Sequence, residues 1–126
     1  MRGVTLDTGA LTALERGDRR ITALLARVTR GPRTEINVPA GALGQAWRNG
    51  RRQARLAQLL SAPETNVVVL DEPTARAAGV LLGRAGTADL IGASVAICAS
   101  ERHQAVVTSD PDDLRRLIPG LLVWSI

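Results

Sequence analysis

Four aspartates stand where their carboxylates could do chemistry together. Asp7 follows a short apolar stretch, and Asp110 follows a second one, with Asp113 three residues further on. Asp89 lies at the start of a long apolar segment. Clustered carboxylates repel one another unless a cation neutralises them, and hard cations such as Mg²⁺ and Mn²⁺ take oxygen ligands. Such a cation suits phosphate ester hydrolysis, because it polarises the phosphoryl oxygen and helps to ionise a water.

Each of these aspartates also fits a structural role at the start of a helix. The run Asp110-Pro111-Asp112-Asp113 combines a capping aspartate, a proline at the first position and acids that the helix dipole favours. Asp89 would gain the same small stabilisation in a first turn, and Asp7 could close a turn by bonding to the backbone. For each aspartate taken singly, both interpretations remain open.

The residue types that the chain lacks exclude several kinds of site. All 16 basic positions are arginine, so a P-loop and Schiff-base chemistry are excluded. Tyr and Phe are absent, which removes the usual platform for stacking bases, and the single His103 excludes a histidine-rich zinc site. The single Cys98 can form no intramolecular disulfide and favours a reducing compartment, the cytoplasm.

Strand and helix patterns alternate along the 126 residues and predict one domain over residues 1–126, with no run long enough to span a membrane. Strands are expected at 4–6, 35–39, 67–70, 105–108 and 121–126. Helices are expected before Gly17, at 18–28, 43–47, 51–60, 74–82 and 111–117, and in a long segment that Thr87 would cap. The continuous apolar run at 67–70 predicts a strand covered on both faces.

This alternation predicts a three-layer α/β/α sandwich with a central, largely parallel sheet. In such sheets ligands bind beyond the carboxyl ends of the strands. Asp7 and Asp110 follow the first and fourth expected strands. If these two strands are neighbours, their carboxylates project into a common pocket.

At these residues the sequence resembles the PIN-domain ribonucleases, and most closely the VapC-type toxins of bacterial toxin–antitoxin pairs. The matching pieces, in chain order, are Val4–Leu11, then Asp89 with Ile91, Ala93 and Ala96, then Val106–Leu114. The resemblance covers the whole chain and implies a PIN-like fold. It also implies a metal-dependent endoribonuclease that cleaves structured cellular RNA, forms a homodimer and is held inactive by a small antitoxin.

The resemblance assigns the catalytic site to Asp7, Asp89, Asp110 and Asp113. It implies that Asp7 and Asp110 bind Mg²⁺ or Mn²⁺ directly, whereas Asp89 and Asp113 act through water or on a second ion. Thr8 and Ser109 would orient ligands or waters.

Position 45 departs from the family pattern, which has a glutamate in the short helix after the second strand. The matching residue here is Gln45, whose amide carries no charge but offers a carbonyl oxygen. Loss of one negative charge should lower metal affinity or leave the ion with more water. A surface residue with no role in the site remains the other interpretation of Gln45.

Arginines cluster at two places. Arg48, Arg51, Arg52 and Arg55 would contact RNA phosphates or acids of an antitoxin, with three of them roughly on one helical face, or else form a solvated surface. A second cluster, 16–20, has the same ambiguity. Trp47 is expected to pack in the core or anchor a partner, and Trp124 to pack in the core.

The favoured hypothesis is the endoribonuclease toxin, with a water activated at the acidic site attacking the phosphate. The alternative is a catalytically weak PIN fold that binds an antitoxin or RNA without efficient cleavage, for which Gln45 argues. A small-molecule phosphohydrolase is a remote third, because no glycine-rich phosphate loop is present in the sequence. Metal-dependent RNA cleavage separates the first two.

Overall fold

A computed structural model describes residues 3–126 and contains one sheet of five strands in the order β3-β2-β1-β4-β5. All four neighbouring pairs are parallel, so every strand ends at the same edge of the sheet. The strands are β1 (Gly3–Leu6), β2 (Glu35–Pro39), β3 (Thr65–Val68), β4 (Ala105–Thr108) and β5 (Val123–Ser125).

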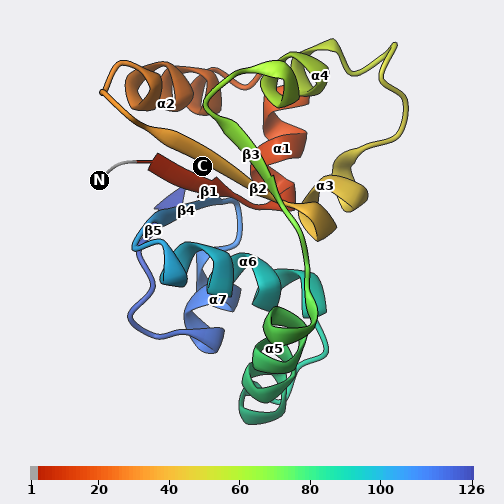
Figure 1. Cartoon of the computed structure of the whole chain (residues 1–126), viewed down its shortest axis with the longest axis vertical. Coiled ribbons are helices and arrows are strands. Elements are labelled where there is room, and N and C mark those ends of the chain that lie inside the picture. The colour runs from red at the N-terminus through yellow and green to blue at the C-terminus, as the bar shows by residue number, and fades with distance from the viewer. Residues whose placement is uncertain (1–2) are drawn as a thin grey trace.

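Helices cover both faces of this sheet (Figure 1). On one face lie α1 (Thr8–Glu15), α2 (Arg19–Thr29) and α4 (Ala54–Ser61), and on the other lie α5 (Glu72–Ala85), α6 (Leu90–Glu101) and α7 (Pro111–Leu117). The short helix α3 (Ala40–Ala46) continues directly from β2 at the edge where the strands end. The predicted three-layer sandwich is therefore confirmed.

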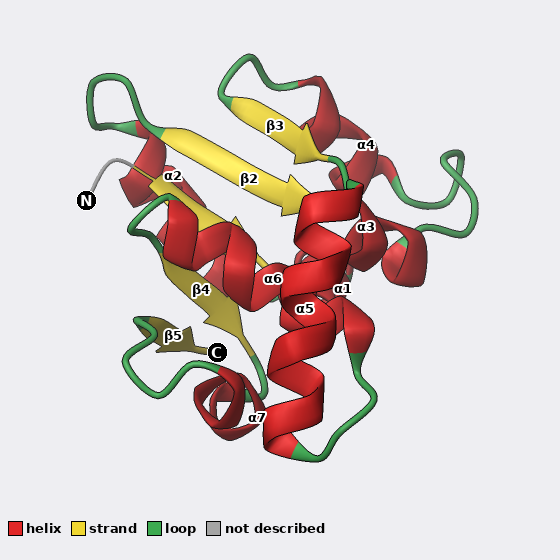
Figure 2. Cartoon of the chain, turned by 60° about the horizontal axis from the view of Figure 1, so that its bottom comes forward, coloured by secondary structure: helices red, strands yellow, loops and turns green. Residues whose placement is uncertain are grey.

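The core is centred on the two middle strands and on α6. Every residue of β1 and β4 is buried. Helix α6 is buried from Ala93 to Ala99 because it lies against β1, β2 and β4 on one side and against α5 and α7 on the other (Figure 2). A helix that is apolar all round belongs in such a middle position. Among residues 3–126 no single helix is long and apolar enough to cross a membrane, and α5 with α6 would reach that length only as a pair bent by 113°.

Two expectations about burial are wrong. The strand predicted at 67–70 is β3, which spans Thr65–Val68 at an edge of the sheet. Val67, in the strand, and Val69, just after it, are 46% and 69% exposed. Trp124 lies on the opposite edge strand, β5, and is 36% exposed instead of packing in the core. In both cases an apolar sequence predicts a buried strand, but the position of the strand in the sheet decides how much of it is covered.

Several element boundaries also differ from the prediction. The long helix begins at Leu90 with Asp89 as its N-cap, so Thr87 does not cap it. The helix expected at 51–60 begins at Ala54, and residues 47–53 form a loop, which breaks the predicted helical face of arginines. Helix α5 continues past its glycines to Ala85 and ends at Gly86, whose φ of 68° is in the left-handed region that glycine favours.

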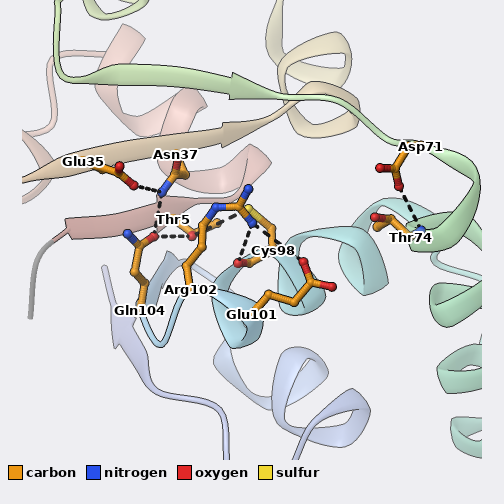
Figure 3. A network of polar contacts seen from close by, with 9 residues as sticks. All are labelled: Thr5, Glu35, Asn37, Asp71, Thr74, Cys98, Glu101, Arg102 and Gln104. Carbon is orange, nitrogen blue, oxygen red and sulfur yellow. Dashed lines mark hydrogen bonds and ion pairs between the residues drawn. The ribbon is translucent and has the colours of Figure 1, made fainter.

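Three neutral polar side chains meet inside the molecule between the sheet and α6, and we refer to Thr5, Asn37 and Gln104 as the amide network (Figure 3). Their residues are 0%, 1% and 5% exposed. Gln104 Oε1 accepts hydrogen bonds from Thr5 Oγ1 and from Asn37 Nδ2, both at 3.0 Å. The network therefore satisfies buried donors that would otherwise cost stability.

Candidate functional site

The ends of β1 and β4 converge on a cavity of about 170 Å³, which we call the acidic cavity. Its polar lining consists of Asp7, Thr8, Gln45, Asp89, Ser109, Asp110 and Asp113. The structure thus brings together all seven residues that the sequence placed in the candidate site. Ile91, Val95 and Leu114 give the cavity an apolar wall that sequence reasoning did not assign to it.

Asp7 is positioned by β1 and by the start of α1. Its Oδ1 accepts a hydrogen bond from the backbone N–H of Ala10 at 2.8 Å, so Asp7 caps α1 while lining the cavity. Burial raises the pKa of the Asp7 carboxyl above its ordinary value, although hydrogen bonds from Thr108 and from the backbone of α1 act in the opposite direction. The structural and chemical interpretations of Asp7 are therefore compatible.

Asp110 and Asp113 form a pair at the start of α7. The pKa of Asp110 is raised first by a hydrogen bond with Asp113, then by desolvation and by the charges of Asp113 and Asp112. Although Asp110 is the N-cap residue of α7, its side chain makes no capping hydrogen bond to any described residue. Asp110 therefore occupies the N-cap position that the sequence predicts, and its carboxyl group also lines the cavity.

Asp89 reaches the cavity from the start of α6. Its Oδ1 accepts from the backbone N–H of Gly92 at 2.9 Å. A Cβ atom at position 92 would overlap Asp89 Oδ2, so the glycine makes room for the carboxylate. Gly9 has a similar function, because a Cβ there would overlap the Ser109 hydroxyl. The two glycines therefore allow the Asp89 carboxylate and the Ser109 hydroxyl to lie close to the backbone at the starts of α6 and α1.

Thr108 is the functional candidate that sequence reasoning missed. It is fully buried at the end of β4, and its Oγ1 accepts the N–H of Asp110 at 2.8 Å. The same side chain hydrogen-bonds to Asp7. Thr108 therefore links the two strand ends that carry the central aspartates. The available signal was a hydroxyl at the last position of an otherwise apolar, buried strand.

The ligands that the cavity offers suit a hard divalent cation in chemical type. Among residues 3–126, no group of three or more His, Cys, Asp or Glu side chains is gathered closely enough to hold one ion. Mg²⁺ usually binds through one or two carboxylates and keeps several waters. The carboxylates that line the cavity fit this sparse mode of binding, and their mutual repulsion would be relieved by a cation.

A second cavity, of about 190 Å³, lies between α6 and the ends of β2 and β3. Figure 3 shows Asp71 and Thr74 on one side of it and Glu101 and Arg102 on the other. Asp71 Oδ1 accepts from the backbone N–H of Thr74, and hydrogen bonds with Thr74 lower the Asp71 pKa. Glu101 Oε2 lies 4.0 Å from Arg102 Nη1, so these two side chains form an ion pair. Because its charges are compensated, this cavity is the weaker candidate.

The four arginines proposed to bind RNA or an antitoxin lie outside the acidic cavity. Arg48 Nη1 donates to the carbonyls of Gly44 and Trp47, and Arg55 Nη1 donates to the carbonyl of Glu15. Arg51 and Arg52 are exposed in the loop between α3 and α4. All four arginines are exposed, and two of them, Arg48 and Arg55, also donate to backbone carbonyls.

Comparison with solved structures identifies the fold. VapBC2 from Rickettsia felis, bound to a DNA fragment from their promoter, matches with a TM-score of 0.69 and 16% identity over 98% of both chains. A toxin–antitoxin complex from Klebsiella pneumoniae matches with a TM-score of 0.72 and 16% identity over 98% of this chain and 99% of that chain. FitAcB from Neisseria gonorrhoeae matches with a TM-score of 0.67 and 17% identity over 97% of this chain and 96% of that chain.

No protein-family model matches the sequence, and a search of curated proteins finds no relative. At 16–17% identity the structural matches show a shared fold, which confirms the PIN-like sandwich that the resemblance implies.

Proposed function

We propose that this chain is a metal-dependent endoribonuclease, the toxin component of a cytoplasmic toxin–antitoxin pair. The observation that carries the proposal is the acidic cavity, where four aspartates from three separate chain segments line one space. The fold shared with a toxin–antitoxin complex from Klebsiella pneumoniae and with VapBC2 and FitAcB supports the biological setting. Its substrate would be the phosphodiester bonds of cellular RNA.

In this proposal, Asp7 and Asp110 hold Mg²⁺ or Mn²⁺ directly, and Asp89 and Asp113 contribute through water or a second ion. The bound ion would polarise the phosphoryl oxygen, help to ionise the attacking water and stabilise the leaving oxygen. A carboxylate of Asp7 or Asp110 takes the proton from the water. Ser109 and Thr8 orient ligands at the rim.

The proposed partners are RNA, an antitoxin and a second copy of the chain. The exposed guanidinium groups of four arginines would contact phosphates of RNA or acids of the antitoxin, since arginine pairs well with either: Arg48, Arg51, Arg52 and Arg55. A homodimer would place two acidic cavities in one particle, as the family resemblance implies.

Replacing Asp7 by Asn tests the proposal. Asn also caps helices well, so the fold should survive while the charge is lost. Mn²⁺-dependent cleavage of a labelled RNA should fall by about 1000-fold, equal to about 4 kcal/mol in the barrier. Asp71→Asn is the matched control, because Asp71 caps α5 in the same way but lies outside the acidic cavity. Full cleavage by Asp7→Asn, or equal losses in the two variants, would contradict the proposal.

A catalytically weak binding module is the second candidate function. It is favoured by the neutral amide at Gln45 and by the finding that, among residues 3–126, no three His, Cys, Asp or Glu side chains are grouped to hold one ion. Such a protein would bind RNA or an antitoxin without metal-dependent cleavage. Binding of RNA by the wild type without cleavage at any Mn²⁺ concentration would favour this candidate over the endoribonuclease.

A further inference from the structure

Gln45 lines the acidic cavity with an amide group whose two ends are not equivalent. The hydroxyl of Thr8 donates to Gln45 Oε1 at 2.7 Å. Thr8 begins α1 and directly follows Asp7, so this bond ties the amide to the element that positions Asp7. The nitrogen Nε2 carries two N–H donors and no acceptor. With one lone pair of Oε1 taken by Thr8, Gln45 offers a ligand two N–H donors and one remaining lone pair, so hydrogen-bond donors outnumber acceptors at this amide.

A donor at this position suits a phosphate better than it suits a cation. The cavity already holds four aspartates, of which Asp110 and Asp113 are close enough to share a hydrogen bond. A carboxylate at position 45 would add a further negative charge facing any phosphate oxygen that enters. The Gln45 amide adds no charge and can donate to that oxygen, an interaction that is stronger than one between neutral groups.

We infer that Gln45 binds the RNA phosphate and is not a metal ligand: its Nε2–H donates to a non-bridging phosphate oxygen, and Thr8 fixes the orientation of the amide. This inference rests on the proposed function, because it takes RNA as the substrate. The residue at position 45 would then set the relative affinity of the cavity for phosphate and for the cation. An amide favours the phosphate, and a carboxylate favours the cation.

Two measurements on three variants test the inference. The stabilisation of RNA-free protein by Mn²⁺ alone is read from its thermal unfolding midpoint. The affinity for a fluorescein-labelled RNA hairpin in Mn²⁺ is read from initial fluorescence anisotropy, before cleavage proceeds. The variants are Gln45→Ala, Gln45→Glu and, as control, Gln58→Ala, since Gln58 is exposed on α4 away from the cavity.

Gln45→Ala should leave unchanged the rise in unfolding midpoint that Mn²⁺ causes, which we call the Mn²⁺ shift. It should weaken RNA binding by about 10-fold, as expected for one hydrogen bond to a charged group. Gln45→Glu should enlarge the Mn²⁺ shift and weaken RNA binding more than Gln45→Ala does. The control should match the wild type in both measurements. A smaller Mn²⁺ shift in Gln45→Ala would make Gln45 a metal ligand, and unchanged RNA affinity would make it a surface residue. Either outcome overturns the inference.

The role of Thr8 is tested by a double-mutant cycle. Thr8→Val removes the hydroxyl that holds Oε1 while keeping the shape of the side chain. If Thr8 acts through Gln45, the double variant should bind RNA no more weakly than the weaker single variant. Losses that multiply would show independent roles and overturn the positioning role of Thr8. A wild type that neither binds nor cleaves RNA would instead remove the proposed function itself, and the inference with it.

Discussion

The acidic cavity and the amide network lie at two depths of the same sheet, and their polar groups are arranged in opposite ways. In the amide network, Gln104 accepts from both Thr5 and Asn37, and all three side chains are neutral and buried. In the acidic cavity, like charges gather at the strand ends, and the pKa values of Asp7 and Asp110 are raised by burial and by a neighbouring carboxyl, respectively. Buried neutral groups that hydrogen-bond to one another stabilise a fold, whereas clustered like charges are typical of a site that binds a ligand.

The contrast also holds between two aspartates that occupy the same kind of local position. Asp7 and Asp71 each follow a strand and cap the next helix through a backbone N–H three residues further on. Hydrogen bonds with Thr74 lower the pKa of Asp71, whereas burial raises the pKa of Asp7. The cap itself is therefore no sign of function, and the surroundings of the carboxylate distinguish the two residues.

The largest stability effect is expected from breaking the amide network. Gln104→Leu keeps the approximate volume but leaves the Thr5 hydroxyl and the Asn37 amide without their common acceptor. The free energy of unfolding should fall by about 2 kcal/mol, because a buried group left unsatisfied costs about 1–3 kcal/mol, and Asn37 Nδ2 keeps only a 3.5 Å bond to Glu35 Oε2. RNA cleavage per folded molecule should stay at the wild-type level. Urea denaturation and a cleavage assay on the folded fraction measure the two quantities.

Gln58→Leu, at an exposed position of α4, is the matched control and should change the free energy of unfolding by at most about 0.5 kcal/mol. If Gln104→Leu were as mild as this control, the amide network would have no stabilising role. If Gln104→Leu abolished cleavage without destabilising the protein, the amide network would have a role in the reaction and would not be separate from the acidic cavity.

A smaller effect, now on the acidic cavity alone, is expected from Gly92→Ala. The new methyl group would displace the Asp89 carboxylate and weaken its bond to the backbone N–H of residue 92. The lost cap costs about 1 kcal/mol, and the gain in helix propensity offsets it by about the same amount. The free energy of unfolding in EDTA should therefore change little, while Mn²⁺ binding should weaken by about 10-fold.

Gly79→Ala provides the comparison, because Gly79 lies in α5 with no described atom near the added methyl group. It should stabilise the protein by up to about 1 kcal/mol and leave Mn²⁺ binding unchanged. Thermal unfolding with and without Mn²⁺ measures both variants. Equal Mn²⁺ shifts in Gly92→Ala and the wild type would mean that Asp89 serves only as a cap.

The sequence predicted the sheet and the convergence of the aspartates because both follow from local order. Apolar stretches that alternate with helices specify a parallel sheet, and Asp7 and Asp110 stand directly after two of its strands. The order of strands across the sheet is a long-range property. The sequence therefore could not show that Val67 lies on an edge strand and Val69 just beyond its end, or that β5 leaves Trp124 exposed.

Within the site, contacts between distant residues were the part that sequence could not supply. Thr87 and Asp89 are both good capping residues, and only packing of α6 selects Asp89. From the sequence, Thr108 is predicted only to be the last residue of an apolar strand. In the structure its side chain contacts both Asp7 and Asp110. The bond between Thr8 and Gln45 joins residues 37 positions apart. Each of these depends on side-chain geometry that residue type does not determine.

The smallest effect is a pH dependence that distinguishes Asp7 from Asp71 without any substrate. Burial raises the folded-state pKa of Asp7 above its ordinary value of 3.8. In the pH interval between the unfolded-state and folded-state pKa values, the folded protein therefore binds more protons than the unfolded chain. Stability from this group is therefore present below the interval and is lost as the pH rises through it. For Asp71 the pKa is lowered, so its stability is lost as the pH falls.

In EDTA, the free energy of unfolding of Asp7→Asn relative to the wild type should therefore increase as the pH is raised from about 4 towards neutrality. For Asp71→Asn this difference should change in the opposite direction and mainly below about pH 4, because the folded-state pKa of Asp71 is lowered. Other titrating groups are common to each pair and cancel. Adding Mg²⁺ should reverse the sign for Asp7→Asn, because a cation held by the Asp7 carboxylate stabilises only the wild type. Parallel pH profiles for the two variants, unaffected by Mg²⁺, would reduce Asp7 to a helix cap like Asp71.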